Sequence, residues 1–354
     1  MKRIISLSLA LFLVLAAFAF PAAAEEREIR IGLLSMLNCT EEQYASYEEL
    51  RWKIGARMLK NGSAYGAFTN ITVPENLEGL RFKTVFYESL DAMIMGLMAG
   101  EIDYMQVYKN VAEYLISRND ELEIKLGFDD MEGNGSIVSR LIIDSVSNDF
   151  SFLFSRESSA LRDQFNDAIQ FMHEDGTLQR LIDEQITATN QGQEIRNVEI
   201  PHIEGAETIH VAVTGALPPM DYVNESGVPC GFNTAVLAEI SQRIGKNIEI
   251  TVVDSIGRIM AMSTGVADAV FWTRINAGLE EIDAGMDEIE EVTDKLIQEL
   301  QDQLTEEEVE FLLDLRQAVM EAGVLLRMTD VPDNTINTVS YFSDTLTLVG
   351  MKTH

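Results

Sequence analysis

The stretch SLDAMIMGLMAGEIDYM, residues 89–105, has a counterpart later in the chain, SIGRIMAMSTGVADAVF at residues 255–271. With an offset of 165 positions, the identical residues that align are Ile94 with Ile259, Met95 with Met260, Gly100 with Gly265, and Asp103 with Asp268. Each copy follows an apolar, β-rich run, RFKTVFYE before the first and NIEITVVD before the second. The sequence therefore predicts a strand, a helix that ends at glycine and a second strand in each half of the chain.

Strands and helices are predicted to alternate around both copies. The expected strands lie at 28–37, 81–88, 208–215 and 247–254, and the expected helices at 44–62, 158–186 and 234–246. This alternation is typical of parallel α/β sheets covered by helices. Gly-x-x-Asp after a helix is also common in helix-to-strand loops, so the repeat by itself leaves shared descent of the halves open.

A polar, weakly periodic segment that contains glycine, residues 188–207, divides the chain, and we interpret it as a linker. We expect an α/β domain at 25–150 and a second α/β domain at 208–354. Between them, residues 151–187 are predicted to form a returning strand and closing helices that pack on the other domain.

Residues 1–24 have the features of a secretory signal peptide. Lys2 and Arg3 precede an apolar run, and Ala22 and Ala24 fit the small-residue cleavage rule, so we expect cleavage before Glu25. A membrane anchor is the alternative, but the run is shorter than the roughly 20 residues that a span needs. The mature protein is expected to be periplasmic or secreted, without membrane insertion after cleavage.

The formal net charge of −32 makes nucleic acid and anionic membrane surfaces improbable partners, because both would repel the chain. Asp and Glu are concentrated at 280–314, inside a region, 277–326, that we predict to be an inserted acidic helical hairpin. This insert could act as a lid, dock a partner protein or simply be a solvated decoration.

The sequence indicates neither a metal site nor a cofactor. Its four histidines are not clustered at metal-ligand spacing. Cys39 and Cys230 could pair in an oxidising compartment, but two free thiols are the expected state.

Residues 211–254 resemble the opening of family 3 of the extracellular solute-binding proteins, which serve polar amino-acid ABC transporters. The shared features are Pro218-Pro219, Gly227, Gly231-Phe232 and the helix that ends at Gly245. STGVADAVFWTR (263–274) is similar to the family's next element, a strand that ends at a ligand-binding Thr/Arg loop, and 338–350 is similar to the strand that leaves the first lobe. The resemblance implies a two-lobed type II periplasmic-binding-protein fold.

The first half of the chain resembles the family's second lobe, so the lobes occur in reversed order. Residues 152–186, including Asp175-Gly176, are similar to the family's closing strand and helices. We interpret this order as a circular permutation, in which the linker joins what are usually the two ends. One covalent crossing near 150–156 should remain, and strand 343–350 should cross without a chain connection beyond it. A domain-swapped dimer or a remnant of a tandem fusion is the alternative.

The resemblance implies a ligand site in the cleft between the lobes. Arg274 would bind a carboxylate in a fork and Thr273 would add a donor; a surface salt bridge for Arg274, core packing for Trp272 and a plain helix cap for Thr40 are the structural alternatives. The complete set of predicted ligand-binding residues is Ser35, Asn38, Thr40, Gln106, Tyr108, Asp221, Tyr222, Trp272, Thr273 and Arg274.

The chain departs from the family where the second lobe usually places an acid for an amino group, because Gln106-Val107-Tyr108 stand there. This departure disfavours a standard α-amino acid and leaves a carboxylate, a peptide or an aromatic solute open. Met220 replaces a usual aromatic, and Met105, Met220 and Tyr108 could line a softer pocket.

We therefore expect a binding subunit that captures a small polar solute by hinge closure and delivers it to the permease of an ABC importer. A sensor or partner-binding protein on the same fold is the alternative. A dehydratase-like enzyme is a weaker one, since Asp221 and Glu41 lack diagnostic spacing for acid–base catalysis. We expect no catalytic residues.

Overall fold

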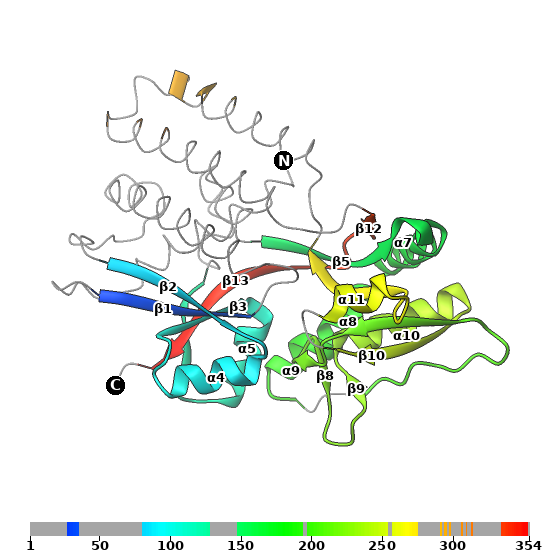
Figure 1. Cartoon of the computed structure of the whole chain (residues 1–354), viewed down its shortest axis with the longest axis horizontal. Coiled ribbons are helices and arrows are strands. Elements are labelled where there is room, and N and C mark those ends of the chain that lie inside the picture. The colour runs from blue at the N-terminus through cyan, green and yellow to red at the C-terminus, as the bar shows by residue number, and fades with distance from the viewer. Residues whose placement is uncertain are drawn as a thin grey trace.

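The computed structural model describes residues 27–34, 80–127, 147–193, 197–253, 257–274 and 334–352, with isolated positions between 291 and 313. Its strands form a ten-stranded sheet and a small three-stranded sheet. Figure 1 shows two groups of strands and helices side by side, with strands β5 and β13 running between them. The structure therefore has the predicted two-lobed α/β architecture. The predicted helix at 44–62 lies outside the described ranges, and so does the predicted helical insert at 277–326 apart from the isolated positions between 291 and 313.

The lobe from the first part of the chain, here the N-lobe, is built on parallel strands in the order β2–β1–β3. Its elements are β1 (Arg27–Leu34), β2 (Leu80–Tyr87), α4 (Leu90–Met98), β3 (Tyr104–Tyr108), α5 (Lys109–Arg118) and β4 (Leu122–Leu126). The predicted strands around 28–37 and 81–88 are confirmed over the residues that the structure describes.

The second lobe, here the C-lobe, repeats this arrangement with parallel strands in the order β10–β6–β11. Its elements are β6 (Thr208–Val213), α10 (Phe232–Ile244), β10 (Asn247–Val252), α11 (Gly257–Ser263) and β11 (Ala269–Arg274). A short hairpin sheet of β7 (Ala216–Leu217), β8 (Asp221–Val223) and β9 (Pro229–Cys230) connects β6 to α10.

Two antiparallel strands hold the lobes in one sheet. Strand β5 (Ser147–Ser155) pairs with β11 and with β12 (Thr335–Asn337) in the C-lobe. Strand β13 (Phe342–Met351) pairs with β5 through residues 342–345 and with β3 and β4 through residues 346–351. The strand order β10–β6–β11–β5–β13–β3–β1–β2 therefore reads as two matching halves that meet between β5 and β13.

The repeated sequence forms the same contact in both lobes. In the N-lobe, Asp103 N donates to Arg30 O and Arg30 N donates to Asp103 Oδ2, both at 2.8 Å. In the C-lobe, Asp268 N donates to His210 O and His210 N donates to Asp268 Oδ2, again at 2.8 Å. The Asp carboxylate thus accepts a hydrogen bond from a backbone N–H of the neighbouring parallel strand, beside the backbone bonds between the strands. This shared role explains why Asp occurs in both copies.

The helix end before this rung is also repeated. Gly100 and Gly265 have φ values of 72° and 75°, a region that favours glycine. The next residue in each copy donates back to the helix, Glu101 N to Gly96 O and Val266 N to Ala261 O, both at 2.8 Å. The predicted cap of the first copy is present too, because Ser89 Oγ accepts from Ala92 N at 3.2 Å.

The helices that come after β5 contact the C-lobe. They comprise α7 (Ser159–Glu174), α8 (Thr177–Ile182), a π-helical turn (Asp183–Thr187) and α9 (Ala188–Asn190), and α7 and α8 both contact α10. The helix extends to Asn190, three residues into the segment predicted as linker, because Thr189 Oγ1 bonds Gln185 O at 2.8 Å and α9 contacts α5.

Residues 197–207 of the predicted linker are attached to the C-lobe by several contacts, among them Cys230 Sγ, which donates to Asn197 Oδ1 at 3.0 Å, and the bonds of one buried side chain, Asn247. Asn247 Oδ1 accepts from Ile203 N at 2.7 Å, and Asn247 Nδ2 donates to Ile203 O at 3.0 Å and to Ala206 O at 3.2 Å. Asn247 is 6% exposed. The amide therefore satisfies backbone groups of a segment without regular secondary structure.

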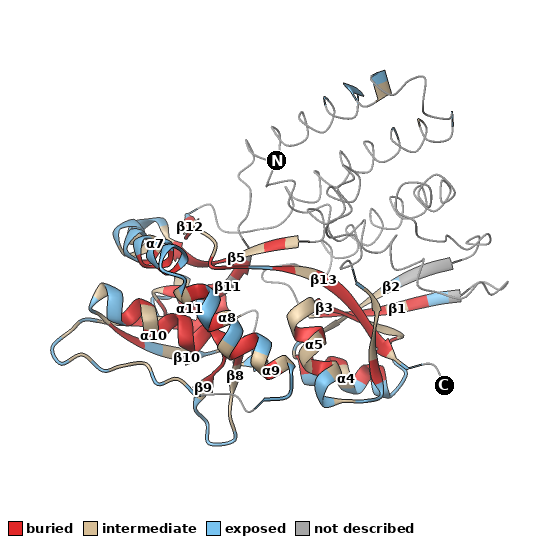
Figure 2. Cartoon of the chain, turned by 180° about the vertical axis from the view of Figure 1, so that it is seen from behind, coloured by how far each residue is buried: buried red, intermediate tan, exposed pale blue. Residues whose placement is uncertain are grey.

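Aromatic side chains fill the C-lobe core beneath β5. The ring of Phe152 lies 5.4 Å from that of Phe165, 5.8 Å from Phe271 and 4.9 Å from Tyr341. Figure 2 shows buried residues concentrated on the central strands and on the inner sides of the helices. Met105 and Met220 are fully buried. The suggestion that these methionines line a ligand pocket is therefore wrong, because the cores of the lobes contain them.

Among the described residues, no helix combines the length and the apolar character needed to cross a bilayer.

We predict that Asp103→Ala and Asp268→Ala each lower the free energy of unfolding by about 1–3 kcal/mol, because each leaves a strand N–H without its acceptor. Denaturant unfolding measures this change. Asp120→Ala, at an exposed turn of the N-lobe, is the control and should change stability by less than about 0.5 kcal/mol. Equal changes in the free energy of unfolding for all three variants would refute the structural role assigned to Asp103 and Asp268.

We predict that Asn247→Ala makes the chain more susceptible to limited proteolysis within 197–207 and costs about 1–3 kcal/mol of stability, because three backbone bonds are lost. Glu249→Ala, on the same strand but exposed, is the control. Unchanged cleavage of the segment in Asn247→Ala would show that other contacts hold it.

Candidate functional site

The strands that carry predicted ligand residues end at the junction of the lobes. In β11, Ala269 pairs with Phe154 and Arg274 pairs with Phe150, so the strand runs toward the end of β5 that pairs with β13. In β3, Tyr108 pairs with Leu346, near the part of β13 that pairs with β5. The register therefore brings the carboxyl ends of β3 and β11 toward the same place, where α/β sheets commonly bind ligands.

Phe150 lies between the two lobes at this junction. Its ring contacts that of Tyr108 edge to face, with the centroids 4.8 Å apart and the planes at 84°. Its backbone pairs with Arg274 on one side and with Phe342 on the other. Tyr108 and Arg274, predicted from different lobes, thus flank the same residue.

Thr273 is part of a buried polar cluster on the same strands. Its Oγ1 donates to Ser151 O at 2.9 Å, and Ser151 Oγ donates to Thr273 O at 3.2 Å. Asn337 Nδ2 donates to Ser151 Oγ at 2.7 Å. Because Thr273 is 5% exposed, its hydroxyl links β11 to β5 in this structure, and its part in ligand binding stays a prediction.

Asp221 closes the turn that comes after β6. Its Oδ2 accepts from Thr214 N at 2.9 Å, Thr214 Oγ1 at 3.0 Å and Gly215 N at 2.8 Å. Burial raises the pKa of Asp221, against the effects of these hydrogen bonds and of the Arg258 charge. This carboxylate oxygen is occupied by the chain itself, so the geometry shows a structural role for Asp221; a contact with ligand stays a prediction.

Arg258 is a buried cation near this turn that the sequence analysis did not identify. Its Nη1 donates to Phe271 O at 2.9 Å, and burial lowers its pKa to about 10 although the charge of Asp221 opposes that shift. Arg258 lies in the otherwise apolar helical segment RIMAM. A single charged residue among apolar ones is the sequence feature that could have identified it.

Tyr222 is half-buried on β8 and faces the N-lobe. Burial is the largest cause of the raised pKa of the Tyr222 phenol. Cys230 and Tyr114 raise this pKa further, whereas the charge of Arg118 lowers it. Tyr114 and Arg118 belong to α5, so the phenol of a C-lobe residue responds to charges and dipoles of the other lobe. Figure 1 shows α4 and α5 on one side of the junction and β8, β9 and α9 on the other.

The remaining predicted residues are placed only in part. Gln106 is 7% exposed on β3, and its Oε1 has no hydrogen-bond partner in the part of the chain that the structure describes. Trp272 and Arg274 lie on β11, but their side chains are outside what the structure describes. Ser35, Asn38 and Thr40 also lie outside the described residues, as does Cys39. Cys230 is buried and not in a disulfide.

The start of α10 contributes buried polar groups that sequence reasoning missed. Asn233 and Thr234 are 0% and 3% exposed, and their side-chain polar atoms have no hydrogen-bond partner. The helix comes after Gly231, which has a φ of 101° and a backbone so close to Pro219 O that a Cβ would lie 2.6 Å from it. The hairpin therefore seats this helix start tightly against the Pro218-Pro219 turn.

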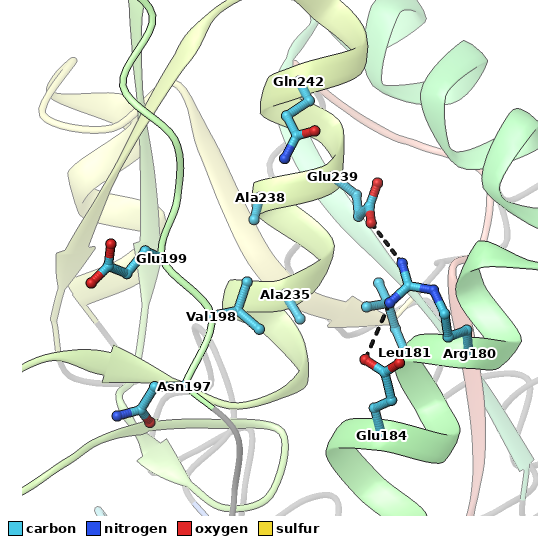
Figure 3. A pocket seen from close by; sticks show the side chains of 10 residues that line it. All are labelled: Arg180, Leu181, Glu184, Asn197, Val198, Glu199, Ala235, Ala238, Glu239 and Gln242. Atoms are coloured by element: carbon cyan, nitrogen blue, oxygen red, sulfur yellow. Dashed lines mark hydrogen bonds and ion pairs between the residues drawn. The ribbon is translucent and has the colours of Figure 1, made fainter.

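A cavity of about 310 Å³ lies beside the C-lobe, between α8, α10 and residues 197–199 (Figure 3). Its guanidinium, Arg180, is held between Glu184 at 3.1 Å and Glu239 at 2.7 Å. Because two carboxylates neutralise this cation, the cavity is a poor anion site. No predicted ligand residue lines it.

Within the ranges that the structure describes, no group of three or more His, Cys, Asp and Glu residues is arranged to hold a metal ion.

Comparison with known proteins supports the resemblance found in the C-lobe. Residues 209–282 match the family model of the bacterial extracellular solute-binding proteins, family 3. This segment contains β6, the β7–β9 hairpin, α10, β10, α11 and β11. The recognition of this family is thus confirmed for the segment. Among curated proteins, none matches the chain.

Comparison with solved structures gives matches of low identity and low TM-score, of which three are described here. NikA of Staphylococcus aureus, in complex with Ni(L-His)2, has 12% identity and a TM-score of 0.34, and the match covers 77% of this chain and 57% of NikA. The periplasmic domain of BvgS from B. pertussis has 11% identity and a TM-score of 0.33, and the match covers 92% of this chain and 37% of the BvgS chain. The alkanesulfonate-binding protein SsuA of Xanthomonas axonopodis pv. citri, bound to MOPS, has 10% identity and a TM-score of 0.31. This match covers 86% of this chain and 85% of SsuA.

We predict that Asp221→Ala lowers the free energy of unfolding by about 3 kcal/mol, because the variant leaves two backbone N–H groups and a hydroxyl without their charged acceptor. Glu225→Ala, exposed in the same hairpin, is the matched control and should be nearly neutral. Denaturant unfolding checks both. A neutral Asp221→Ala would show that this carboxylate does not support the turn.

Proposed function

We propose that the chain is an exported solute-binding protein that captures a small polar solute between its lobes. The observation that supports this proposal is that Phe150 contacts the ring of Tyr108 from the N-lobe and pairs through its backbone with Arg274 of the C-lobe. The match of residues 209–282 to a solute-binding family supports it. A solute that touches both lobes would favour their closed arrangement over the open one.

The proposed ligand contacts are Arg274 and Thr273 from the C-lobe, with Tyr108 and Gln106 from the N-lobe; Ser35, Asn38, Thr40, Asp221, Tyr222 and Trp272 complete the proposed site. Arg274 would bind a carboxylate or another planar anion in a fork. Gln106 and Tyr108 provide an amide and a ring where an ammonium group would need an acid. These groups favour an organic acid, a peptide or an aromatic solute over a free α-amino acid.

We also propose that the halves are circularly permuted relative to the family. The register of β13 supports this interpretation, because β13 pairs first with the C-lobe strand β5 and then with β3 and β4 of the N-lobe. The fixation of residues 197–207 by Asn247 is consistent with a segment that joins two former ends.

Delivery to the permease of an ABC importer is the proposed role of the bound state. Export through removal of residues 1–24, with cleavage before Glu25, would place the protein in the periplasm or outside the cell. The acidic insert at 277–326 and a sensory role are not needed for this proposal. No catalytic group is assigned, in keeping with the binding family that residues 209–282 match.

The decisive experiment identifies, by mass spectrometry, the small molecules that copurify with the full chain, and then tests each one for thermal stabilisation. At a concentration of about 100 Kd, a true ligand should stabilise the protein by about 2.7 kcal/mol. We predict that Arg274→Ala weakens binding by roughly 10–100-fold, as expected for the loss of a charged hydrogen-bond donor.

Arg243→Ala is the control, because Arg243 pairs with Asp175 at 2.7 Å on the outer surface of the C-lobe. Its affinity for the ligand should equal that of the wild type. The proposal fails if nothing copurifies and if neither organic acids, peptides, amino acids nor aromatic solutes raise the melting temperature.

A further inference from the structure

Two polar side chains face each other where β5 and β13 cross between the lobes. Asp344 is the register partner of Asn148, and such partners project from the same face of a sheet with their Cβ atoms roughly 5 Å apart. Asp344 is 5% exposed and Asn148 is 1% exposed. The hinge of the molecule therefore contains a dry carboxyl–amide pair.

The hydrogen bonds of Asp344 leave this amide unused. Asp344 Oδ2 accepts from Asn110 N at 3.2 Å, and Oδ1 accepts from Thr345 N at 2.8 Å. Both Nδ2 and Oδ1 of Asn148 are buried without a hydrogen-bond partner among the described residues. A proton on Asp344 would convert the carboxyl into a donor for Asn148 Oδ1, whereas the ionised form offers that oxygen nothing.

Helix α5 connects this pair to the C-lobe. Asn110, whose N–H bonds Asp344, accepts through its carbonyl oxygen from Asn190 Nδ2 at 3.1 Å. Asn190 Nδ2 also lies 3.2 Å from Glu113 Oε2. Because Asn190 ends α9 of the closing helices, one continuous set of hydrogen bonds runs from the hinge strand through α5 to the other lobe. Figure 1 shows α5 and α9 next to each other at the junction.

The burial of Asp344 favours a proton there. Burial raises its pKa to about 7, Glu113 adds to the rise, and the bonds from Asn110 and Thr345 act in the opposite direction. The same helix carries two cations, Lys109, which lies 3.9 Å from Glu113, and Arg118 in its last turn. From the other elements packed here, β3 supplies Tyr108, and β5 and α9 supply the uncharged Asn148 and Asn190.

We propose that Asp344 is a proton-dependent latch of the hinge. As a neutral acid, it donates to Asn148 Oδ1 and leaves no charge in the buried pairing of β5 with β13. Release of this proton to solvent leaves a buried negative charge at the hinge, which favours an arrangement of the lobes that admits water to the carboxylate. The angle between the lobes then depends on pH, whichever solute the protein binds.

The sign of the linked stability change is set by the direction of the shift. The pKa of Asp344 in the folded protein, about 7, lies above the ordinary value of 3.8. Between these values the folded state holds more protons than the unfolded chain, so stability falls as pH rises. The contribution of Asp344 is complete below the unfolded pKa and is lost as pH passes through the folded one.

The test compares thermal unfolding and small-angle X-ray scattering of the full chain at about pH 5.5 and about pH 8.5, on either side of the titration. We predict that the wild-type melting temperature falls by on the order of 5 °C more than that of Asp344→Asn, since the amide cannot titrate. The radius of gyration should rise with pH in the wild type and stay constant in Asp344→Asn.

Two further variants separate the latch from general charge effects. Asp149→Asn removes a carboxylate from the neighbouring position of β5, where it bonds Ser343, and it should behave like the wild type in both measurements. Asn190→Ala breaks the contact with α5 and should give the larger radius at both pH values. A constant wild-type radius would overturn the proposal, and so would an Asp344→Asn variant that keeps the wild-type pH response in either measurement.

Discussion

The antiparallel pairing of β5 with β13 is the constraint on which the two-lobed arrangement depends. Residues 147–150 pair with residues 345–342, and each strand then continues into one lobe. The buried cluster is continuous across this pairing, since Met105 of the N-lobe and Phe271 of the C-lobe belong to the same apolar core. Any change in the angle between the lobes must therefore be absorbed by these two strands and by the residues packed on them.

The near-symmetry of the lobes arises from a local device used twice. A helix that ends at a glycine and an Asp that bonds the preceding strand return the chain to the sheet at the same register in both halves. The lobes differ after that strand, because α5 begins directly after β3, whereas 275–333 separates β11 from β12. The shared scaffold thus places two chemically different strand ends, Tyr108 and Arg274, on opposite sides of Phe150.

The polar groups at the junction divide into those that hold the structure and those that are left unpaired. Asp221, Thr273 and Asn247 all have their hydrogen bonds satisfied by the chain, as buried polar groups generally must. Gln106, Asn148 and Asn233 have buried atoms without such partners. In a folded protein, unpaired buried amides are unfavourable unless water, a proton or a ligand completes them, so they are the more informative group for function.

The sequence by itself determined the local elements and their order: the helix cap at Ser89, the turn at Gly100 and the Gly-x-x-Asp repeat could be identified because each depends on residues only a few positions apart. Family-like motifs at 211–254 and 263–274 also identified the C-lobe, and the family model matches residues 209–282. Only the tertiary structure decided that Asp221 closes a turn, that Met105 and Met220 belong to the core, and that Asp344 faces Asn148. Those outcomes depend on strands and helices far apart in the chain, up to 234 positions for Asn110 and Asp344, and on the loss of water around them, which no local pattern encodes.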